Sequence, residues 1–589
     1  MGVLERSDSV IAEVLAGGHA RDLLGRFPPF ALHGARAPGA GGPAEVGTII
    51  HAEVATGAVL AVLAGAGTAR AEVYRLAASE GLDPLHPPAV EAEAAAFAGA
   101  AAGLDDPSLV SLEALPFVTI DGAESRDLDQ ALHVEHRADD TLLVHYALAD
   151  ASYFVRPGTA LFDEALLRGA SFYLPGLVVP MLPRVLSEGL TSLNPDVARR
   201  ALVFRVVVDR EGGAHEVAIF RARIKSQRKL SFGAVQRFFD GADATLTETT
   251  FAASLRALKT LGERRLALAE VAHVVRHARR ELTVGFVDPD GRTFVAFEEA
   301  RLPVETWNEQ LSVLINVEGA RALAARVGEA GLHAIFRVHP APEAVDVARL
   351  AATVRAIVAA HELDAEWAWD PATEALAGYL GRLRTEGALA PVARAIQRQA
   401  LVANQRSSYS PMPGLHYGLG APCYGRFTAP MREMVGIFTH KETLELLAGT
   451  PPDPADEPLQ AAVIASAEAA QARQGRLTKG SNACVLDALF GPDLALPEAE
   501  RPARPGTLLG LAADRAYVVL DSPPLEVKLY FGLLPGARLV SPAEAELGDV
   551  RVRLGDRLAV RVIGWDKGRA GGRASGRWCL APIAPGSVS

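Results

Sequence analysis

The chain has 589 residues, 49% of them hydrophobic, which is enough for several domains with separate cores. Its 59 Lys and Arg against 70 Asp and Glu give a net charge of −11, which argues against a protein that coats nucleic acid through overall positive charge. Any nucleic-acid path is therefore expected to be a local basic channel. No apolar run approaches the roughly 18 residues that suggest a membrane span. Three widely separated cysteines, Cys423, Cys484 and Cys579, predict free thiols in a cytoplasmic protein.

The first expected unit is an N-terminal module of residues 1–112. Residues 9–24 are amphipathic, and residues 47–65 contain β-type runs. Two helical patterns follow at 69–79 and 88–100, separated by the breaker-rich EGLDPLHP, which predicts a helix-turn-helix or winged-helix-like module. The second pattern is acidic and lacks Arg, Asn and Gln, so we expect a packing or entrance module rather than a base-reading helix.

The second expected unit is an α+β catalytic domain of residues 113–495. Residues 203–224 predict a hairpin that turns at Glu211-Gly212-Gly213, while residues 306–327 and 345–361 have helical spacing. A further helical pattern reaches about residue 489. After the linker LPEAERPARPG (496–506), residues 506–585 alternate as five short strands, which fit a small barrel of the oligonucleotide-binding type.

An acidic cluster follows the β-type run at the start of the catalytic domain. In FVTIDGAESRDLDQAL (117–132), Asp121, Asp127 and Asp129 precede Gln130, which stands where a fourth acid could have stood. Such an oxygen-only set suits Mg²⁺ or Mn²⁺, and two such ions could clamp an in-line displacement at phosphorus. The spacing does not fit an EF-hand. Spacing alone nevertheless leaves a catalytic metal site and a solvated acidic loop equally open.

The same segment resembles the active-site signature of the RNase II/RNase R family. Further similarities follow in the family's order, including VHYALADASYFVRPG (144–158), ARIKSQRKLSF (222–232), NEQLSVLINVEGARAL (308–323) and HYGLGAPCYGRFTAPMREM (416–434). Residues 506–585 resemble the family's S1 domain. The resemblance covers about residues 115–585, and its many ordered motifs make it more specific than the acidic cluster alone.

This resemblance implies a processive, hydrolytic 3′-to-5′ exoribonuclease in RNA turnover. Such an enzyme threads single-stranded RNA into a channel and releases nucleoside 5′-monophosphates. It implies that Asp121, Asp127 and Asp129, with Gln130, hold Mg²⁺ or Mn²⁺, and that Arg432 neutralises charge at the scissile phosphate. The alternative for Arg432 is a surface salt bridge with Glu433.

Other residues are assigned to RNA by the same resemblance. Tyr173 would stack on the 3′-terminal base, Glu309 would bind the terminal ribose, and Lys225, Arg228 and Lys229 would form a basic wall for phosphates. The alternatives are a core tyrosine, a surface acid on a helix, and an exposed strand edge. The resemblance also implies a monomer with no membrane or DNA partner.

Three departures from the family pattern change these expectations. Gln130 replaces an acid, which predicts weaker metal binding and leaves open a catalytically impaired, RNA-binding homologue. Glu433 and Gly436 stand where the family often has a basic residue and an aspartate. No pair of cold-shock-type barrels is recognisable before residue 113, so the helical module is expected in their place.

Overall fold

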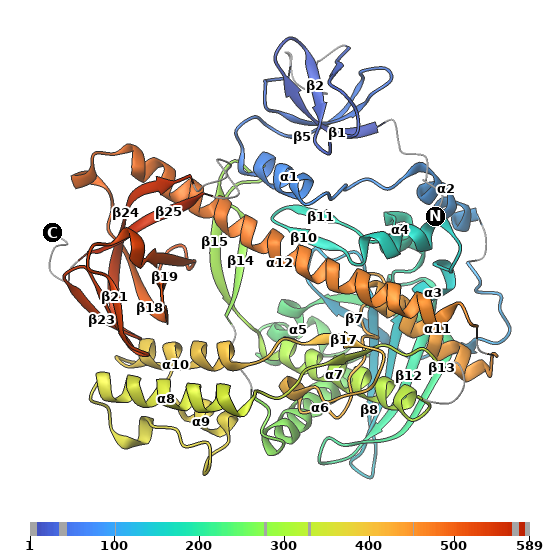
Figure 1. The fold of residues 1–589 in the computed structure, drawn as a ribbon. Coiled ribbons are helices and arrows are strands. Elements are labelled where there is room, and N and C mark those ends of the chain that lie inside the picture. The colour runs from blue at the N-terminus through green and yellow to red at the C-terminus, as the bar shows by residue number, and fades with distance from the viewer. Residues whose placement is uncertain are drawn as a thin grey trace.

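The computed structural model describes residues 9–33, 44–99, 102–275, 280–327, 332–451, 453–567 and 576–583. Figure 1 shows an N-terminal sheet at one end of the molecule, a large central α/β region, and a C-terminal β-rich region to the side. In the described residues, no helix is both long enough and apolar enough to cross a membrane.

The N-terminal residues form a β-sheet, to which both the amphipathic stretch 9–24 and the predicted β-type runs at 47–65 belong. Five antiparallel strands lie in the order β3-β2-β1-β4-β5. They are β1 (Ser9–Leu15), β2 (His19–Asp22), β3 (Phe30–Ala31), β4 (Ile49–Glu53) and β5 (Val59–Ala64). The amphipathic stretch 9–24 is thus a hairpin, and its turn contains Gly17 and Gly18 at φ 76° and 72°, angles that glycine adopts without steric cost.

The two predicted N-terminal helices are confirmed after this sheet. Helix α1 (Ala69–Ser79) begins after Thr68, whose side chain accepts a hydrogen bond from the Ala71 amide, and α2 (Pro88–Ala96) begins with a proline. Helix α1 packs on α12 (Asp456–Ala495) and α2 on α4 (Ala160–Arg168). Both helices therefore join the N-terminal sheet to the central region, as a packing module would.

The central region is built on a sheet with the order β12-β9-β8-β7-β13-β6. Strand β12 also pairs with β13, so the sheet closes on itself. The strands are β6 (Val110–Ser111), β7 (Phe117–Asp121), β8 (Gln130–His136), β9 (Leu142–Ala149), β12 (Ala198–Val208) and β13 (Ala214–Ser231). The predicted 203–224 hairpin is the β12–β13 pair, with Gly212 at φ 85° in its turn.

Helices cover the central sheet and account for its apolar strands. One core lies between the sheet and α6 and α7, and a second lies between the sheet and α4, α11 and α12. Besides α4 and α12, the helices around the central sheet include α3 (Ala151–Phe154), α5 (Phe232–Phe239), α6 (Ala252–Val271), α7 (Pro303–Ala324) and α11 (Met434–Ala448). Because both faces are covered, β9 is almost entirely buried.

Three two-stranded antiparallel sheets lie outside this sheet. They are β10 (Phe172–Leu174) with β11 (Leu177–Val179), β14 (Arg280–Phe286) with β15 (Phe294–Ala300), and β16 (Phe336–Val338) with β17 (Ser408–Ser410). The β10–β11 hairpin packs beside α12, and Figure 1 shows α12 crossing the molecule from the C-terminal region to α11.

The C-terminal region has more strands than the five expected. One sheet has the order β20-β19-β18-β24-β25, and a second has the order β21-β22-β23. Their bounds are β18 (Arg504–Ala512), β19 (Arg515–Leu520), β20 (Glu526–Tyr530), β21 (Arg538–Ser541), β22 (Glu544–Leu547), β23 (Val550–Arg553), β24 (Arg557–Asp566) and β25 (Arg577–Ile583). Parts of the predicted 506–585 unit, at 568–575 and 584–585, lie outside the described residues. The S1 assignment stays a prediction.

The C-terminal sheets share one core with three helices of the preceding region. These are α8 (Ala344–Ala360), α9 (Leu376–Arg382) and α10 (Ala390–Ala403). Helices α7 and α8 confirm the helical spacing at 306–327 and 345–361, and α12 confirms the last helical pattern.

Candidate active site

The three aspartates lie at one end of strands β7 and β8. Asp121 is the last residue of β7, Asp127 and Asp129 lie in the connection, and Gln130 is the first residue of β8. The buried run Phe117–Ile120 fixes β7 in the sheet, so Asp121 emerges at its edge. One oxygen of Asp121, Oδ1, accepts hydrogen bonds from the Gly122 amide at 2.7 Å and the Ser125 hydroxyl at 2.9 Å.

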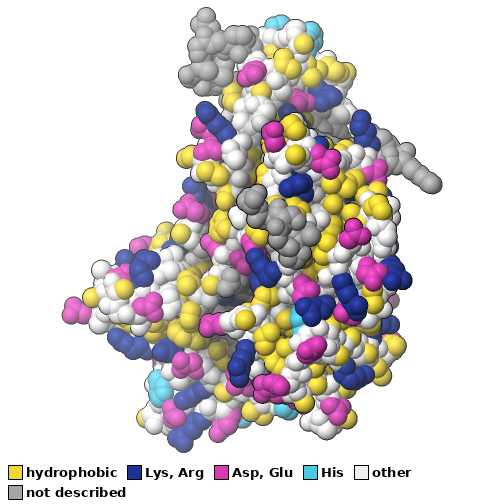
Figure 2. Space-filling model, turned by 90° about the vertical axis from the view of Figure 1, so that its left-hand side faces the viewer, with side chains coloured by type: hydrophobic (Ala, Val, Ile, Leu, Met, Phe, Trp, Pro, Cys, Tyr) yellow, Lys and Arg dark blue, Asp and Glu magenta, His cyan; other side chains and the backbone are white. Residues whose placement is uncertain are grey.

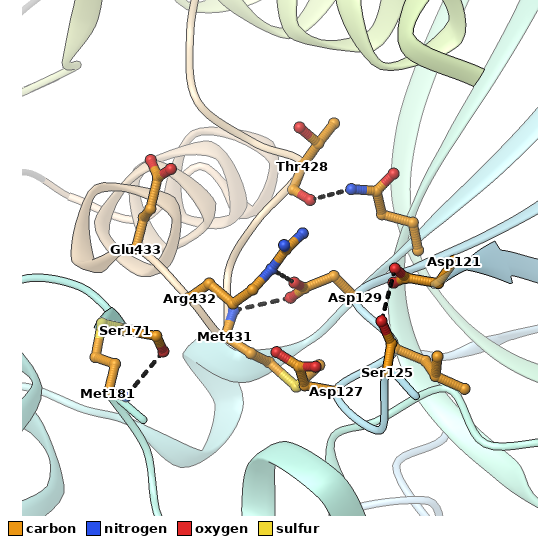
Figure 3. A network of polar contacts seen from close by, with 12 residues as sticks. Asp121, Ser125, Asp127, Asp129, Ser171, Met181, Thr428, Met431, Arg432 and Glu433 are labelled. Atoms are coloured by element: carbon orange, nitrogen blue, oxygen red, sulfur yellow. Dashed lines mark hydrogen bonds and ion pairs between the residues drawn. The ribbon is translucent and has the colours of Figure 1, made fainter. Parts of the chain in front are cut away.

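Asp129 is buried and bound to the segment that carries Arg432. Its Oδ1 accepts a hydrogen bond from the Met431 amide at 3.0 Å, and its Oδ2 lies 2.5 Å from Arg432 Nε. Figure 3 shows the carboxylates of Asp121, Asp127 and Asp129 gathered beside the Arg432 guanidinium. The structure thus brings together all four residues that the sequence assigned to catalysis.

The site holds more negative charge than the nearby guanidinium balances. Burial raises the pKa of Asp129 to about 6 although Arg432 opposes the shift, and burial also raises the pKa of Asp127, with Asp121 adding repulsion. The attraction of Asp129 in turn raises the pKa of Arg432. A second cation beside these carboxylates would relieve this imbalance.

This donor set fits a divalent metal ion. All three side chains offer carboxylate oxygens, the ligands that Mg²⁺ and Mn²⁺ prefer. Across the described ranges, the only three acids with ligand atoms within 4.8 Å of one another are Glu442, Glu445 and Asp456. The aspartate oxygens are more widely spaced than this, and Mg²⁺ usually takes one or two carboxylates together with several waters.

The compact acidic group at Glu442, Glu445 and Asp456 already has its cation. Lys441 Nζ lies 3.0 Å from Glu442, 2.8 Å from Glu445 and 2.7 Å from Asp456. This ammonium offsets part of the negative charge of the three acids and joins α11 to the start of α12. The group is a structural contact, separate from the aspartates of β7 and β8.

Both ends of the Gln130 side chain make hydrogen bonds. Its Nε2 donates to the Thr428 carbonyl, and its Oε1 accepts from the hydroxyls of Tyr146 and Ser312. The two hydroxyls also contact each other at 3.1 Å. Gln130 therefore joins β8, β9 and α7 to the segment that leads to Arg432.

Arg432 does not form the salt bridge with Glu433 that was the alternative. Glu433 pairs instead with Arg426, whose Nε lies 2.9 Å from Oε2. The Arg432 carbonyl accepts from the Ser171 amide at 2.9 Å, which ties the backbone to the residues before β10. A β-carbon at Gly436 would lie 2.9 Å from the Pro430 Cα, so an aspartate cannot fit there unless the backbone shifts.

Tyr173 lies at the site and is not a core tyrosine. Its side chain is exposed, with 45% of the residue surface accessible, and its hydroxyl lies 3.5 Å from Asp127 Oδ2. The Tyr173 backbone is held by Gln474 of α12, whose Oε1 accepts from the Tyr173 amide at 3.2 Å and whose Nε2 donates to its carbonyl at 3.1 Å. Strand β10 pairs with β11 along one edge, and the Gln474 side chain satisfies the Tyr173 backbone groups that point away from β11.

Glu309 lies on α7, one turn before Ser312. Residues three apart share a helix face, which places Glu309 on the side of α7 that contacts Gln130. Its carboxylate is paired with Arg301 at 2.8 Å. No hydrogen bond among the described residues joins it to the aspartates.

The three basic residues of the predicted wall have different surroundings. Lys229 donates to the Ala123 and Ser125 carbonyls at 2.7 and 2.5 Å, so it holds the loop after Asp121. Arg228 is exposed beside it. Lys225 is also exposed, but lies six residues before Ser231, the register partner of Asp121, which is about 20 Å along a strand.

Several residues of this site were not predicted from the sequence. Tyr146, Ser312, Thr428 and Gln474 carry no motif of their own for metal or phosphate chemistry. They lie 16 to 301 positions from the residues that they contact. Only the family similarity of the segments around the first three gave any signal, and Gln474 had none.

Comparison with known proteins gives one family and one fold. The RNB domain family matches residues 110–449. Ribonuclease R of Escherichia coli is 30% identical over 345 residues, covering 58% of this chain and 40% of that protein. Exoribonuclease 2 of Edwardsiella piscicida is 30% identical over 347 residues, covering 58% and 52%. This chain therefore aligns with only about half of these relatives' length.

A solved structure extends the likeness to nearly the whole chain. Mycoplasma genitalium RNase R in complex with ribose-methylated single-stranded RNA has a TM-score of 0.76. The likeness covers 99% of this chain and 91% of that one, at 18% sequence identity. At this identity the likeness establishes the fold.

Proposed function

Since this chain belongs to the RNB domain family, we propose that it is a hydrolytic, processive 3′-to-5′ exoribonuclease. Its substrate is single-stranded RNA, its products are nucleoside 5′-monophosphates, and its role is RNA turnover. The observation that carries the proposal is the pairing of buried Asp129 with Arg432 beside Asp121 and Asp127. The relatives' names, a ribonuclease and an exoribonuclease, support the choice of RNA.

The proposed metal ligands are Asp121, Asp127 and Asp129. Bound Mg²⁺ or Mn²⁺ supplies Lewis-acid activation of water and stabilisation of the leaving oxygen. Arg432 keeps its positive charge and lies beside the carboxylates, where its guanidinium can neutralise charge that develops on the phosphate. Its Nε is used by Asp129, which leaves the terminal nitrogens to contact a phosphate.

The other proposed contacts bind RNA without reading its sequence. The exposed ring of Tyr173, next to Asp127, offers a face on which the 3′-terminal base can stack. Glu309 is assigned to the terminal ribose hydroxyls. Lys225 and Lys229 are assigned to phosphates, with Lys229 also supporting the loop after Asp121. The C-terminal strands are assigned to an S1-type RNA-binding barrel.

Charge supports a local RNA path rather than a broad RNA-coating surface. The net charge is −11, and Figure 2 shows basic and acidic side chains interspersed on the face that it draws. RNA contacts are therefore concentrated at the site, where stacking and phosphate binding act together. We further propose a cytoplasmic monomer with no DNA or membrane partner.

The direct test uses purified protein with 5′-labelled single-stranded RNA and Mg²⁺ or Mn²⁺. We expect progressive shortening from the 3′ end and release of mononucleotides. A DNA oligomer of the same sequence should resist, and equal digestion of DNA would refute the assignment to RNA. Asp129→Asn should abolish cleavage and leave RNA binding intact.

The second candidate is an RNA-binding homologue without turnover. It is favoured by one observation, the amide at Gln130 in place of a fourth acid. The same assay separates the two candidates, because RNA binding without shortening under either metal would reject the enzyme and leave the binding protein.

A further inference from the structure

Gln130 and Asp129 are neighbours that hold the two ends of one short segment, residues 428–432. Gln130 binds its first residue through the Thr428 carbonyl, and Asp129 binds its last two through the Met431 amide and Arg432 Nε. Figure 3 shows this segment passing between Thr428 and Arg432 beside the carboxylates. The position of the guanidinium is therefore set by two adjacent side chains at the start of β8.

The bond from Gln130 to Thr428 has a required direction. A backbone carbonyl can only accept, so the group facing it must donate, and an ionised carboxylate cannot. The other end of the amide faces the hydroxyls of Tyr146 and Ser312, which donate to Oε1. Both ends of the Gln130 side chain thus match their surroundings as an amide. An ionised carboxylate at this position would not match them, because it has no donor for the Thr428 carbonyl.

Helix α7 adds a second hold on the same segment. Asn316 lies one turn after Ser312 and donates from Nδ2 to Thr428 Oγ1 at 3.0 Å, while its Oδ1 accepts from the Phe427 amide at 2.7 Å. Thr428 and Asn316 are 5% and 1% exposed. Since these polar groups are buried, each unmade bond would be costly, and the segment is held in one arrangement.

From these contacts we propose that Gln130 is a positioning residue that fixes residues 428–432, and with them Arg432, and that it is not a ligand of the divalent cation. The proposal deepens the proposed function and rests on it for the role of Arg432. Metal binding then depends on the three aspartates alone. The amide at position 130 therefore has a positioning role in the site, and its presence in place of a fourth acid does not remove a metal ligand that this structure needs.

The test substitutes Gln130→Glu, which has the same shape but adds a charge and removes the donor. A ligand at this position would gain affinity as a carboxylate, whereas a positioning amide would be disrupted. In EDTA, we expect Gln130→Glu to melt about 2 °C or more below the parent chain. Titration with Mn²⁺ alone should give a dissociation constant that is no tighter than in the parent chain.

Activity gives a further readout that general destabilisation does not reproduce. With RNA in excess and below the melting transition, kcat should fall by roughly tenfold, the effect of about 1.4 kcal/mol on the barrier, while KM stays within about twofold. The matched control is Gln227→Glu. Gln227 accepts a bond from Thr250 at 2.5 Å, which a carboxylate also accepts, so its melting temperature should not change.

The proposal is overturned if Gln130→Glu melts like the parent chain and binds Mn²⁺ on the order of tenfold more tightly. If this variant does not fold, Gln130→Ala replaces it. The alanine variant should bind Mn²⁺ within about twofold of the parent chain, and a loss on the order of tenfold would identify Gln130 as a ligand. Absence of RNA cleavage by the parent chain would reject the proposed function, while the melting and Mn²⁺ data would still decide the role of Gln130.

Discussion

The pair of Asp129 and Arg432 predicts that removing the arginine will destabilise the metal-free protein. Arg432→Met keeps an unbranched side chain to about the position of Nε and removes the charge. This leaves the carboxylate of Asp129, 1% exposed, with the Met431 amide as its remaining hydrogen bond from this segment. Breaking a buried ion pair costs about 3–5 kcal/mol. The Arg432 side chain is 35% exposed, so we expect a smaller loss of roughly 2–4 kcal/mol.

The loss should depend on pH in a defined direction. The pKa of Asp129 is already raised to about 6 by burial, and removing Arg432 raises it further. An acid whose folded pKa lies above its unfolded value costs stability as pH rises through the folded pKa. Relative to the parent chain, Arg432→Met should therefore lose little stability at pH 6, where Asp129 can take up a proton, and should lose the most stability at pH 8.

The assay is the melting temperature in EDTA at pH 6 and pH 8, followed by titration with Mn²⁺. We expect a fall of about 4 °C or more at pH 8, and a larger recovery on adding Mn²⁺ than in the parent chain, because the cation replaces the lost positive charge. Arg432→Lys, which keeps a charge, should fall less. If Arg432→Met melts like the parent chain at both pH values, Asp129 is not held by this pair and the reasoning fails.

Three further predictions concern the surroundings of the site. Gln474→Leu removes both bonds to the Tyr173 backbone and should raise the KM for short RNA by about fivefold, the effect of about 1 kcal/mol. The control Gln471→Leu, at an exposed position of α12, should leave this KM unchanged. If Gln474→Leu has the same KM as the parent chain, Gln474 does not position Tyr173. Gly436→Ala places a β-carbon 2.9 Å from the Pro430 backbone and should cost about 1–3 kcal/mol, seen as a lower melting temperature. Gly475→Ala, in open space on α12, should be neutral or stabilising, and similar effects of the two alanines would contradict the steric reasoning. Burial lowers the pKa of His440 to about 4, so stability should fall as pH drops from 6.5, by about 2 kcal/mol at pH 5. His440→Asn should show a smaller fall in melting temperature from pH 7 to pH 5, and an equal fall would exclude His440 as the cause.

Local patterns in the sequence predicted much of the central region. The buried run before Asp121, the double glycine after β12 and the helical spacing of α7, α8 and α12 each determine their element locally. The N-terminal hairpin was missed because residues 9–24 were interpreted only as an amphipathic stretch. Its glycine pair at 17–18 was nevertheless a turn signal.

From spacing alone, the site was predictable only where one segment supplies the residues, whereas Arg432 and Tyr173 were assigned by the family resemblance. The three aspartates and Gln130 lie within ten positions, so their proximity follows from the chain itself. The contacts that decide the role of Gln130 come from Tyr146, Ser312 and Thr428, which only the closed sheet and α7 bring together. The spacing of residues in the sequence does not predict contacts between such distant segments.

The position of Gln474 on α12 has a consequence for how this architecture can be divided. Helix α12 carries Gln474 near its middle and ends at Ala495, nine residues before β18 begins. A cut between them would remove all the C-terminal strands and spare the contact with Tyr173, whereas a cut before residue 474 would remove both. Exchange of the C-terminal strands near residues 496–503 would therefore spare the Gln474–Tyr173 contact, but the incoming strands would have to fill the core that these strands share with α8, α9 and α10.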